Sequence, residues 1–205
     1  MSTFLLAACV SIGASDTKAG SAPWGSDGGD SAAAATTDSA CGDTGFGTRA
    51  WVGERAEGPY AGPPVHINEA MAEEKGGAPV EGGDWIELYN PGTAPVDLDG
   101  SYLDEGALGS TAWPIPCGVT IAGGGYLLVG FRSFADVADV VADYRLNEEG
   151  DDVFLDWFNP DGTVGVASRV QWTEQLRAPN SLARIPDGSE NWQVTASPTP
   201  GAANR

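Results

Sequence analysis

Two short runs in the middle of the chain, at 65–70 and 84–89, constrain the fold most. Each run alternates apolar and polar residues with a period of two, and a Gly-rich, charged loop separates them. In the second run Ile86 and Leu88 point to one side, while the residues on either side of them point to the other. Such alternation is typical of strands that pack one face against a core. The pattern therefore predicts two strands joined by a loop.

The same kind of run continues to the end of the chain. Turn residues separate the runs, as in Asn90-Pro91-Gly92 and Gly123-Gly124-Gly125, and Asp161-Gly162 is typical of a β-hairpin. The 29 Gly and 14 Pro residues of the 205-residue chain agree with a fold rich in turns. We predict strands at 65–71, 84–90, 95–103, 118–122, 125–131, 152–158, 163–171, 181–186 and 191–195.

One segment departs from this pattern and indicates a helix. Ser133 is a suitable N-cap, and apolar or aromatic residues fall on one helical face after it: Phe134, Val137, Val141 and Tyr144. The sequence therefore predicts an all-β fold, a sandwich or barrel, with one short helix near 133–144.

The residues before 65 have a different composition. Residues 10–64 are dominated by Gly, Ser, Ala, Asp and Thr and contain almost no large aliphatic side chains. Such a segment buries too little apolar area to offset the entropy lost on ordering, so we expect 9–64 to be a disordered tether. The folded domain is then expected at 65–205.

The first residues resemble the end of a bacterial lipoprotein signal. Phe4 to Ala8 is apolar, and Leu6-Ala7-Ala8-Cys9 is similar to a lipobox, which makes 1–8 a truncated signal-like segment and Cys9 the site of lipid attachment. No Lys or Arg precedes the run, and the run is short for a signal peptide; a start codon annotated too late would explain both. The alternative is an uncleaved N-terminus with a free thiol. By resemblance to the sorting rule of Gram-negative lipoproteins, Val10 favours the outer membrane.

The charge of the chain excludes some partners. The net charge is −19, and residues 65–205 alone carry 22 of the 29 acids and 7 of the 10 bases, a net charge of −15. A surface this acidic repels phosphate backbones and anionic lipid. We therefore expect no nucleic-acid partner, and contact with a membrane only through a lipid anchor.

Several pieces of the domain, taken in order, resemble the lamin-tail domain in its bacterial form. The match extends over about 65–204, and it is the ordered series of short motifs that makes it specific. The matching pieces are Ile67-Asn68-Glu69, Asp84 to Asn90, Val96 to Leu103, Trp113 to Pro116, Gly124 to Val129, Leu146 to Leu155, Ser181 to Arg184 and Thr199-Pro200-Gly201.

This resemblance implies an immunoglobulin-like β-sandwich in a secreted or surface-attached protein. Bacterial members are commonly extracellular and often accompany hydrolases, so the resemblance implies no activity of its own. The nuclear roles of animal relatives do not transfer, because the chain lacks their coiled-coil rod, basic targeting cluster and C-terminal prenylation motif.

Few residues offer catalytic chemistry. His66 is the single histidine, and no Gly-x-Ser-x-Gly elbow accompanies it, so we interpret it as a structural residue on the solvent side of the first strand. Glu69 and Glu87 lie in the first two strands and could face one another as an acid–base pair. The alternative, which we favour, is that they form hydrogen bonds to neighbouring backbone groups.

Acids crowd in three turns, at 97–100, 104–106 and 148–152, and could hold calcium. None of these turns matches an EF-hand loop, and solvated turn acids are the favoured interpretation.

Five tryptophans could form a sugar-binding platform but are more typical of a sandwich core: Trp85, Trp113, Trp157, Trp172 and Trp192. No zinc site is indicated, because three scattered Cys and one His provide no ligand-spaced pair.

The cysteines predict a covalent link between tether and domain. If Cys9 carries lipid, Cys41 and Cys117 remain as an even pair in an oxidising compartment, and we predict a disulfide between them. The alternative is a buried free Cys117 and a free Cys41.

Taken together, the sequence predicts a non-catalytic binding or structural module, tethered at the bacterial cell envelope as a secreted protein or lipoprotein of the outer membrane. Its partner would be a protein or a cell-surface glycan, and no cofactor is expected. The alternatives are a calcium-dependent adhesion module and a small hydrolase that uses an acidic residue pair.

Overall fold

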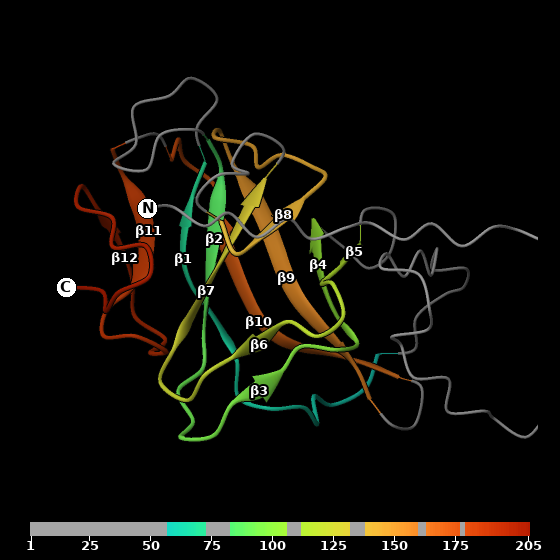
Figure 1. Ribbon diagram of the computed structural model, residues 1–205. Coiled ribbons are helices and arrows are strands. Elements are labelled where there is room, and N and C mark those ends of the chain that lie inside the picture. The colour runs from blue at the N-terminus through green and yellow to red at the C-terminus, as the bar shows by residue number, and fades with distance from the viewer. Residues whose placement is uncertain (1–56, 73–82, 106–111, 132–137, 160–162, 177–178) are drawn as a thin grey trace, which may run out of the picture. The chain divides into compact units, whose positions relative to one another are not determined.

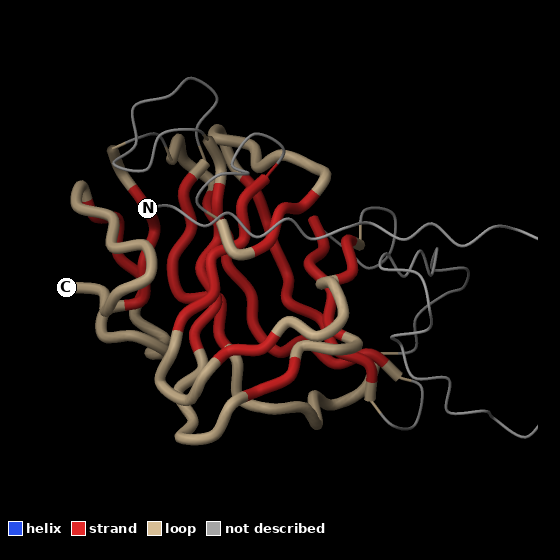
Figure 2. The backbone as a smooth tube through the Cα atoms, viewed as in Figure 1, coloured by secondary structure: helices blue, strands red, loops and turns tan. Residues whose placement is uncertain are grey.

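The fold was analysed in a computed structural model, which describes residues 57–72, 83–105, 112–131, 138–159, 163–176 and 179–205. Every regular element in these residues is a strand (Figures 1 and 2). The strands are β1 (His66–Met71), β2 (Trp85–Tyr89), β3 (Val96–Asp97), β4 (Ser101–Glu105), β5 (Trp113–Pro114), β6 (Thr120–Ile121), β7 (Tyr126–Phe131), β8 (Val140–Ala142), β9 (Asp151–Phe158), β10 (Val164–Trp172), β11 (Ser181–Arg184) and β12 (Trp192–Thr195).

These strands form two main sheets and one small one. The larger sheet has the order β12-β11-β1-β2-β7-β8, the second has the order β10-β9-β4-β5, and β3 pairs with β6. All neighbours are antiparallel except β7 and β8, which are parallel. The two main sheets lie against each other as a β-sandwich (Figure 1), which confirms the predicted all-β fold.

The core lies between the two main sheets, and alternation along each strand decides which residues enter it. From the larger sheet it takes Ile86 and Leu88 of β2, and from the second sheet Leu103 and Leu155, all fully buried. The intervening residues of β2 lie on the other face of the larger sheet. We call this face the outer face, and a second, smaller cluster covers part of it with Met71, Trp85 and Leu128.

A β-bulge at Asn68 changes the face on which β1 residues lie. Ile67 pairs with Leu88 and belongs to the core, but the register then shifts and Glu69 pairs with Glu87 on the outer face. In a regular strand, residues two apart share a face. The bulge therefore turns the Glu69 carboxylate away from the apolar core and towards the outer face.

The turn after β2 is built around a buried amide. Asn90 is fully buried, and its Nδ2 donates to the carbonyls of Ala94 (2.8 Å) and Ile121 (3.1 Å), while its Oδ1 accepts from Gly92 N (2.9 Å). The main chain of Asn90 also bonds to the Gly124–Gly125 turn, in which Gly124 has a φ of 69°. The predicted role of these glycines as a tight turn between strands is confirmed.

The predicted helix near 133–144 is wrong in its described part. Residues 133–137 lie outside the described residues, but Val140–Ala142 form β8, which pairs with Val129–Phe131 of β7. Asp139, just before β8, bonds to β7 on both sides of Leu128: its Oδ2 accepts from Leu128 N (2.7 Å), and its own N–H donates to Leu128 O (2.9 Å). The β-branched pair Val140-Val141 favours a strand, and the edge of the sheet supplies the backbone partners that a helix would otherwise provide.

The packed region begins earlier than position 65. Glu57 forms a parallel bridge with Val164 of β10, and Gly58 N donates to Val164 O (3.0 Å). Tyr60 lies edge-on to Trp157 with ring centroids 6.4 Å apart. The tether was predicted to run to residue 64, so this boundary is corrected to at most residue 56; residues 1–56 lie outside the described part.

No helix among the described residues is long or apolar enough to pass through a membrane.

Candidate functional site

Four segments that are far apart in the chain meet on the outer face beside β1 and β2. They are Asn68-Glu69 of β1, Glu87 of β2, the turn at 185–190, and the segment at 199–204, which we call the strap. Glu69, Glu87 and Asp187 supply carboxylate acceptors, and we call them the carboxylate cluster. All but the 185–190 turn lie in or next to the ordered motifs of the sequence, and each segment contributes a side chain or a backbone group to one hydrogen-bonded network.

Glu69 and Glu87 form the centre of the network. They are register partners on adjacent antiparallel strands, and both are fully buried. Glu69 accepts hydrogen bonds from Ser181 Oγ and from Thr199 N (3.1 Å to Oε2). Glu87 accepts from Gly201 N (2.6 Å) and from Asn68 Nδ2 (3.0 Å). Each carboxylate therefore ties its strand to the strap.

Two amide side chains connect the remaining groups. Asn68 Nδ2 also donates to Asp187 Oδ1 (3.1 Å), and Asn68 Oδ1 accepts from Gly188 N (3.0 Å). Asn204 Nδ2 donates to the carbonyls of Asn68 (3.1 Å) and Arg184 (3.0 Å), and its Oδ1 accepts from Thr199 Oγ1 (2.7 Å). Asn204 is the buried residue of the strap and fixes its end to β1 and β11.

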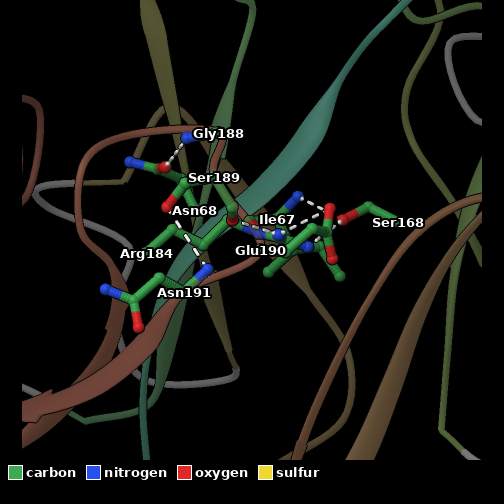
Figure 3. A network of polar contacts seen from close by, with 8 residues as sticks. All are labelled: Ile67, Asn68, Ser168, Arg184, Gly188, Ser189, Glu190 and Asn191. Carbon is green, nitrogen blue, oxygen red and sulfur yellow. Dashed lines mark hydrogen bonds and ion pairs between the residues drawn. The ribbon is translucent and has the colours of Figure 1, made fainter.

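Arg184 of β11 extends the network from one sheet to the other (Figure 3). Its Nε donates to Ile67 O of β1 (2.8 Å), and its NH2 lies 3.4 Å from Ser168 Oγ of β10, which also accepts from Ile67 N (2.9 Å). Its NH1 donates to Ser189 O and pairs with Glu190 Oε1 (3.3 Å). The guanidinium also lies 4.4 Å over the ring of Trp192. One buried cation thus joins both sheets and the 185–190 turn.

Burial controls the electrostatics of the carboxylate cluster. The pKa of Glu87 is raised to about 8, mainly by burial and also by the negative charges of Glu69 and Asp187, against the lowering effect of its hydrogen bonds from Asn68 and Gly201. Burial also raises the pKa of Glu69, and Asp187 adds to this. Burial therefore favours the neutral form of the Glu87 carboxyl up to a higher pH than for an exposed glutamate.

The arrangement limits what the acid pair can do. Catalysis by a carboxylate pair requires that a substrate reach hydrogen-bond distance of both groups. The side chains of Glu69 and Glu87 have no exposed surface, and the donors on their oxygens come from this chain. The expectation that the two residues face one another is confirmed, and so is the expectation that they bond to neighbouring backbone groups.

His66 lies at the start of β1, half-buried, opposite Tyr89. A Cβ placed on Gly188 would lie 3.4 Å from the His66 ring, so the imidazole packs against the 185–190 turn. Burial lowers its pKa, and the nearby Arg184 charge lowers it further. The predicted structural role agrees with this packing, although the residue is less solvent-exposed than expected.

The acidic turns considered for calcium are used locally. Asp97 Oδ1 accepts from Asp99 N (3.0 Å), and Asp99 Oδ1 accepts from Gly118 N (2.9 Å). Asp151 accepts from the backbone N–H groups of Asn147 and Asp152, both at 2.8 Å. In the part of the chain that the structure describes, no group of three or more His, Cys, Asp or Glu residues is placed to hold a metal ion.

A second group of acids meets at the ends of three strands, which the sequence did not predict. Burial raises the pKa of Glu105 at the end of β4 to about 7, with further contributions from Asp151, Asp104 and Asp84. Asp84 also accepts from Leu146 N (2.9 Å). Asp104 and Glu105 of β4 lie on the strand next to β9, which begins at Asp151, whereas Asp84 precedes β2 of the larger sheet, so the packing of the two sheets brings it to the others.

Four of the five tryptophans lie in or against the core, as predicted, and the fifth lies on the outer face. Trp157 and Trp172 belong to the main cluster, Trp113 and Trp192 pack against it, and Trp85 belongs to the outer-face cluster. Trp172 also lines a surface pocket of about 420 Å³ between the end of β10 and strands β11 and β12, together with Leu182 and Val194. Val194 on β12 is 67% exposed.

The cysteine predictions lie mostly beyond the described residues. Cys117 is disulfide-bonded. Cys9, the predicted lipid site, and Cys41, the predicted partner of Cys117, are outside the described residues, so both assignments stay predictions.

The residues that sequence reasoning missed are those that complete the network: Asn68, Ser181, Arg184, Asp187 and Asn204. Most of them lie inside the motifs that carry the family resemblance, and that position was the available signal. Their pairing could not be read from spacing, because partners such as Asn68 and Asp187 are 119 residues apart.

Comparison with known proteins gives one match. A family model described as Lamin Tail Domain matches residues 59–174, which is more than half of the chain. Comparisons with curated proteins and with solved structures find no match.

Proposed function

From the premise that the chain belongs to the lamin tail domain family, we propose that it is a non-catalytic binding or structural module of the bacterial cell envelope. The observation that carries this proposal is the use of the acid pair. Glu69 and Glu87 are fully buried and hydrogen-bonded within the chain, so they hold the strap in place and are closed to a substrate. In this proposal the sandwich is held away from the cell surface and binds a partner at one edge of a sheet.

The envelope location rests on the N-terminal sequence. In this proposal Cys9 carries the lipid in the outer membrane, the Gly/Ser-rich tether up to residue 56 acts as a spacer, and the sandwich is the displayed unit. A protein or cell-surface glycan is the proposed partner. The high negative charge supports this choice, because it disfavours nucleic acid and anionic lipid.

Expression of the full gene in a host that processes lipoproteins tests the anchor. The wild-type protein is expected to partition into the detergent phase, and the Cys9→Ala variant into the aqueous phase. Cys41→Ala serves as the matched control, since it also replaces one cysteine by alanine but should not change partitioning. Equal partitioning of the wild type and Cys9→Ala would refute the anchor.

A stability series with the acid pair tests the non-catalytic assignment. Glu69→Gln and Glu87→Gln should change the unfolding free energy. If a panel of ester, glycoside and phosphoester substrates revealed a hydrolytic activity that either substitution abolished without changing stability, the hydrolase alternative would replace this proposal. A shift of the thermal midpoint on adding calcium, reversed by chelator, would instead favour the adhesion alternative.

A further inference from the structure

The strap is held on the outer face by polar contacts. Its N–H groups donate to all three members of the carboxylate cluster: Thr199 N to Glu69, Gly201 N to Glu87 (2.6 Å) and Asn204 N to Asp187 (2.9 Å). Gly201, Ala202 and Ala203 are exposed, and neither hydrophobic cluster includes a strap residue. Lifting the strap therefore exposes little apolar surface, so it can open without unfolding the sandwich.

The charged groups that act on the pKa values of Glu69 and Glu87 are carboxylates, and they raise both values. The guanidinium of Arg184 is directed to Ile67, Ser168, Ser189 and Glu190. Asp187 Oδ2 accepts a hydrogen bond from the hydroxyl of Tyr126 (2.6 Å). The other titratable or charged groups on the surrounding elements are His66 of β1, Tyr89 of β2, Glu190 in the 185–190 turn and Arg205 after the strap.

Two buried carboxylates opposed in register cannot both be ionised at low cost in such a space. We propose that Glu69 and Glu87 hold one proton between them, that this proton locks the strap onto the sheet, and that its loss as the pH rises opens the strap. When both groups ionise, two negative charges share one buried space beside the half-buried carboxylate of Asp187. Opening the strap relieves their repulsion because it admits water to the carboxylates.

The direction of the pH effect follows from linkage. In the closed state burial raises the pKa of Glu87 to about 8, whereas in the open state the carboxyl meets water and returns to its ordinary value of 4.5. Opening therefore releases a proton at any pH between these two values. The opening equilibrium constant should rise about tenfold per pH unit over this range and level off above pH 8.

Hydrogen exchange on the full-length chain tests the proposal. The measurement gives protection factors between pH 5.5 and 7.5 for three strap amides, those of Thr199, Gly201 and Asn204. A protection factor is already corrected for the intrinsic pH dependence of exchange. The three values should fall about a hundredfold over this range. At each pH they should also stay below those of the β2 and β7 amides, because the strap opens separately from the sandwich.

Two variants and one direct measurement complete the experiment. Glu87→Gln cannot ionise and should remove the fall in strap protection, whereas Glu190→Gln should retain it, because the Glu190 side chain is 89% exposed. The ¹³C shift of the Glu87 carboxyl carbon in wild-type protein reports the proton itself, even if Glu87→Gln does not fold. An ionised Glu87 at pH 6, a strap as protected as β2, or strap protection that does not change with pH would each overturn the proposal.

Discussion

At the scale of single residues, the molecule depends on a few buried polar groups with many partners. Arg184 is 3% exposed, and its guanidinium bonds to a carbonyl of β1, a hydroxyl of β10 and a carbonyl of the 185–190 turn. The planar guanidinium of an arginine can donate hydrogen bonds in three directions at once. A lysine ammonium on its flexible side chain cannot reach the same three acceptors. The residue acts as a fixed joint between the sheets.

Arg184→Lys should therefore be costly even though it preserves charge. It removes donors to Ile67 O and Ser168 Oγ within a buried site, and we expect the free energy of unfolding to fall by about 2–4 kcal/mol. Arg169→Lys is the matched control. Arg169 pairs with Asp152 on the surface with 47% of its side chain exposed, and its replacement should cost less than about 1 kcal/mol. Urea denaturation measures both, and equal costs would contradict the role given to Arg184.

The acid pair marks how far the sequence could predict the site. The alternation of β1 and β2 suggested that Glu69 and Glu87 could face one another, and they do. The same alternation could not predict that a bulge at Asn68 turns Glu69 outward, because a bulge is one extra residue with no marker in this pattern. Nor could it place Asp187 or Asn204, which reach the pair only through the fold.

At the scale of elements, most strands were predicted well, and the misses are short strands. The strands that lie within two residues of their expected ranges are β1, β2, β6, β7, β9, β10, β11 and β12. The predicted strand at 95–103 is instead two strands, because Gly100 turns the chain between them with a φ of 81°. β5 and β8 have two and three residues, which is too short for a period to be recognised, and β8 was assigned to a helix.

The segment at 57–64 packs on the sandwich, although its composition predicted a disordered tether. Its Gly and Pro residues are typical of a linker, yet it packs along β10 and β9. Asn159 holds it with its side chain, which donates to Pro59 O (2.9 Å) and accepts from Ala61 N (3.2 Å). Gly165 makes this close approach possible, because a Cβ there would lie 2.5 Å from Tyr60 Cα.

Gly165→Ala should therefore displace this segment from the sandwich. The added methyl group meets backbone atoms of Tyr60, which cannot move without breaking the contacts around Asn159. We expect the unfolding free energy to fall by about 1–3 kcal/mol and limited proteolysis near residue 60 to become faster. Val166→Ala on the same strand is the control, since Val166 is 43% exposed and should change little. Unchanged proteolysis in Gly165→Ala would mean that 57–64 is not held as described.

At the scale of the whole molecule, acidity and burial act together. The chain carries a net charge of −19, and the two acids Glu87 and Glu105 are held at raised pKa values at separate places in the sandwich, as are their neighbours Glu69 and Asp151. Glu87 has Glu69 and Asp187 as charged neighbours, while Glu105 has Asp151, Asp104 and Asp84, so the two sites share no charged neighbour. Their effects on stability should therefore add.

The expected pH dependence runs against that of most proteins, whose paired carboxylates gain stability above their unfolded pKa. A carboxyl whose folded pKa is raised contributes stability that is complete below its unfolded pKa and is lost as the pH rises through the folded value. For Glu87 this window extends from about pH 4.5 to about 8, and for Glu105 from about 4.5 to about 7. His66 acts in the opposite direction, because burial lowers its pKa and stability is lost as the pH falls below 6.5.

Urea denaturation of four proteins between pH 5 and 9 tests this dependence. The wild type should lose stability up to about pH 8, Glu105→Gln should lose less between pH 5 and 7, and Glu87→Gln should lose less between pH 5 and 8. The double variant should show the sum of the two differences, since Glu87 and Glu105 share no charged neighbour; Glu69 and Asp151, whose pKa values burial also raises, leave a smaller slope in it. Because neutral glutamines cannot release a proton on unfolding, a wild-type slope that persists in the double variant would place the proton release elsewhere in the molecule.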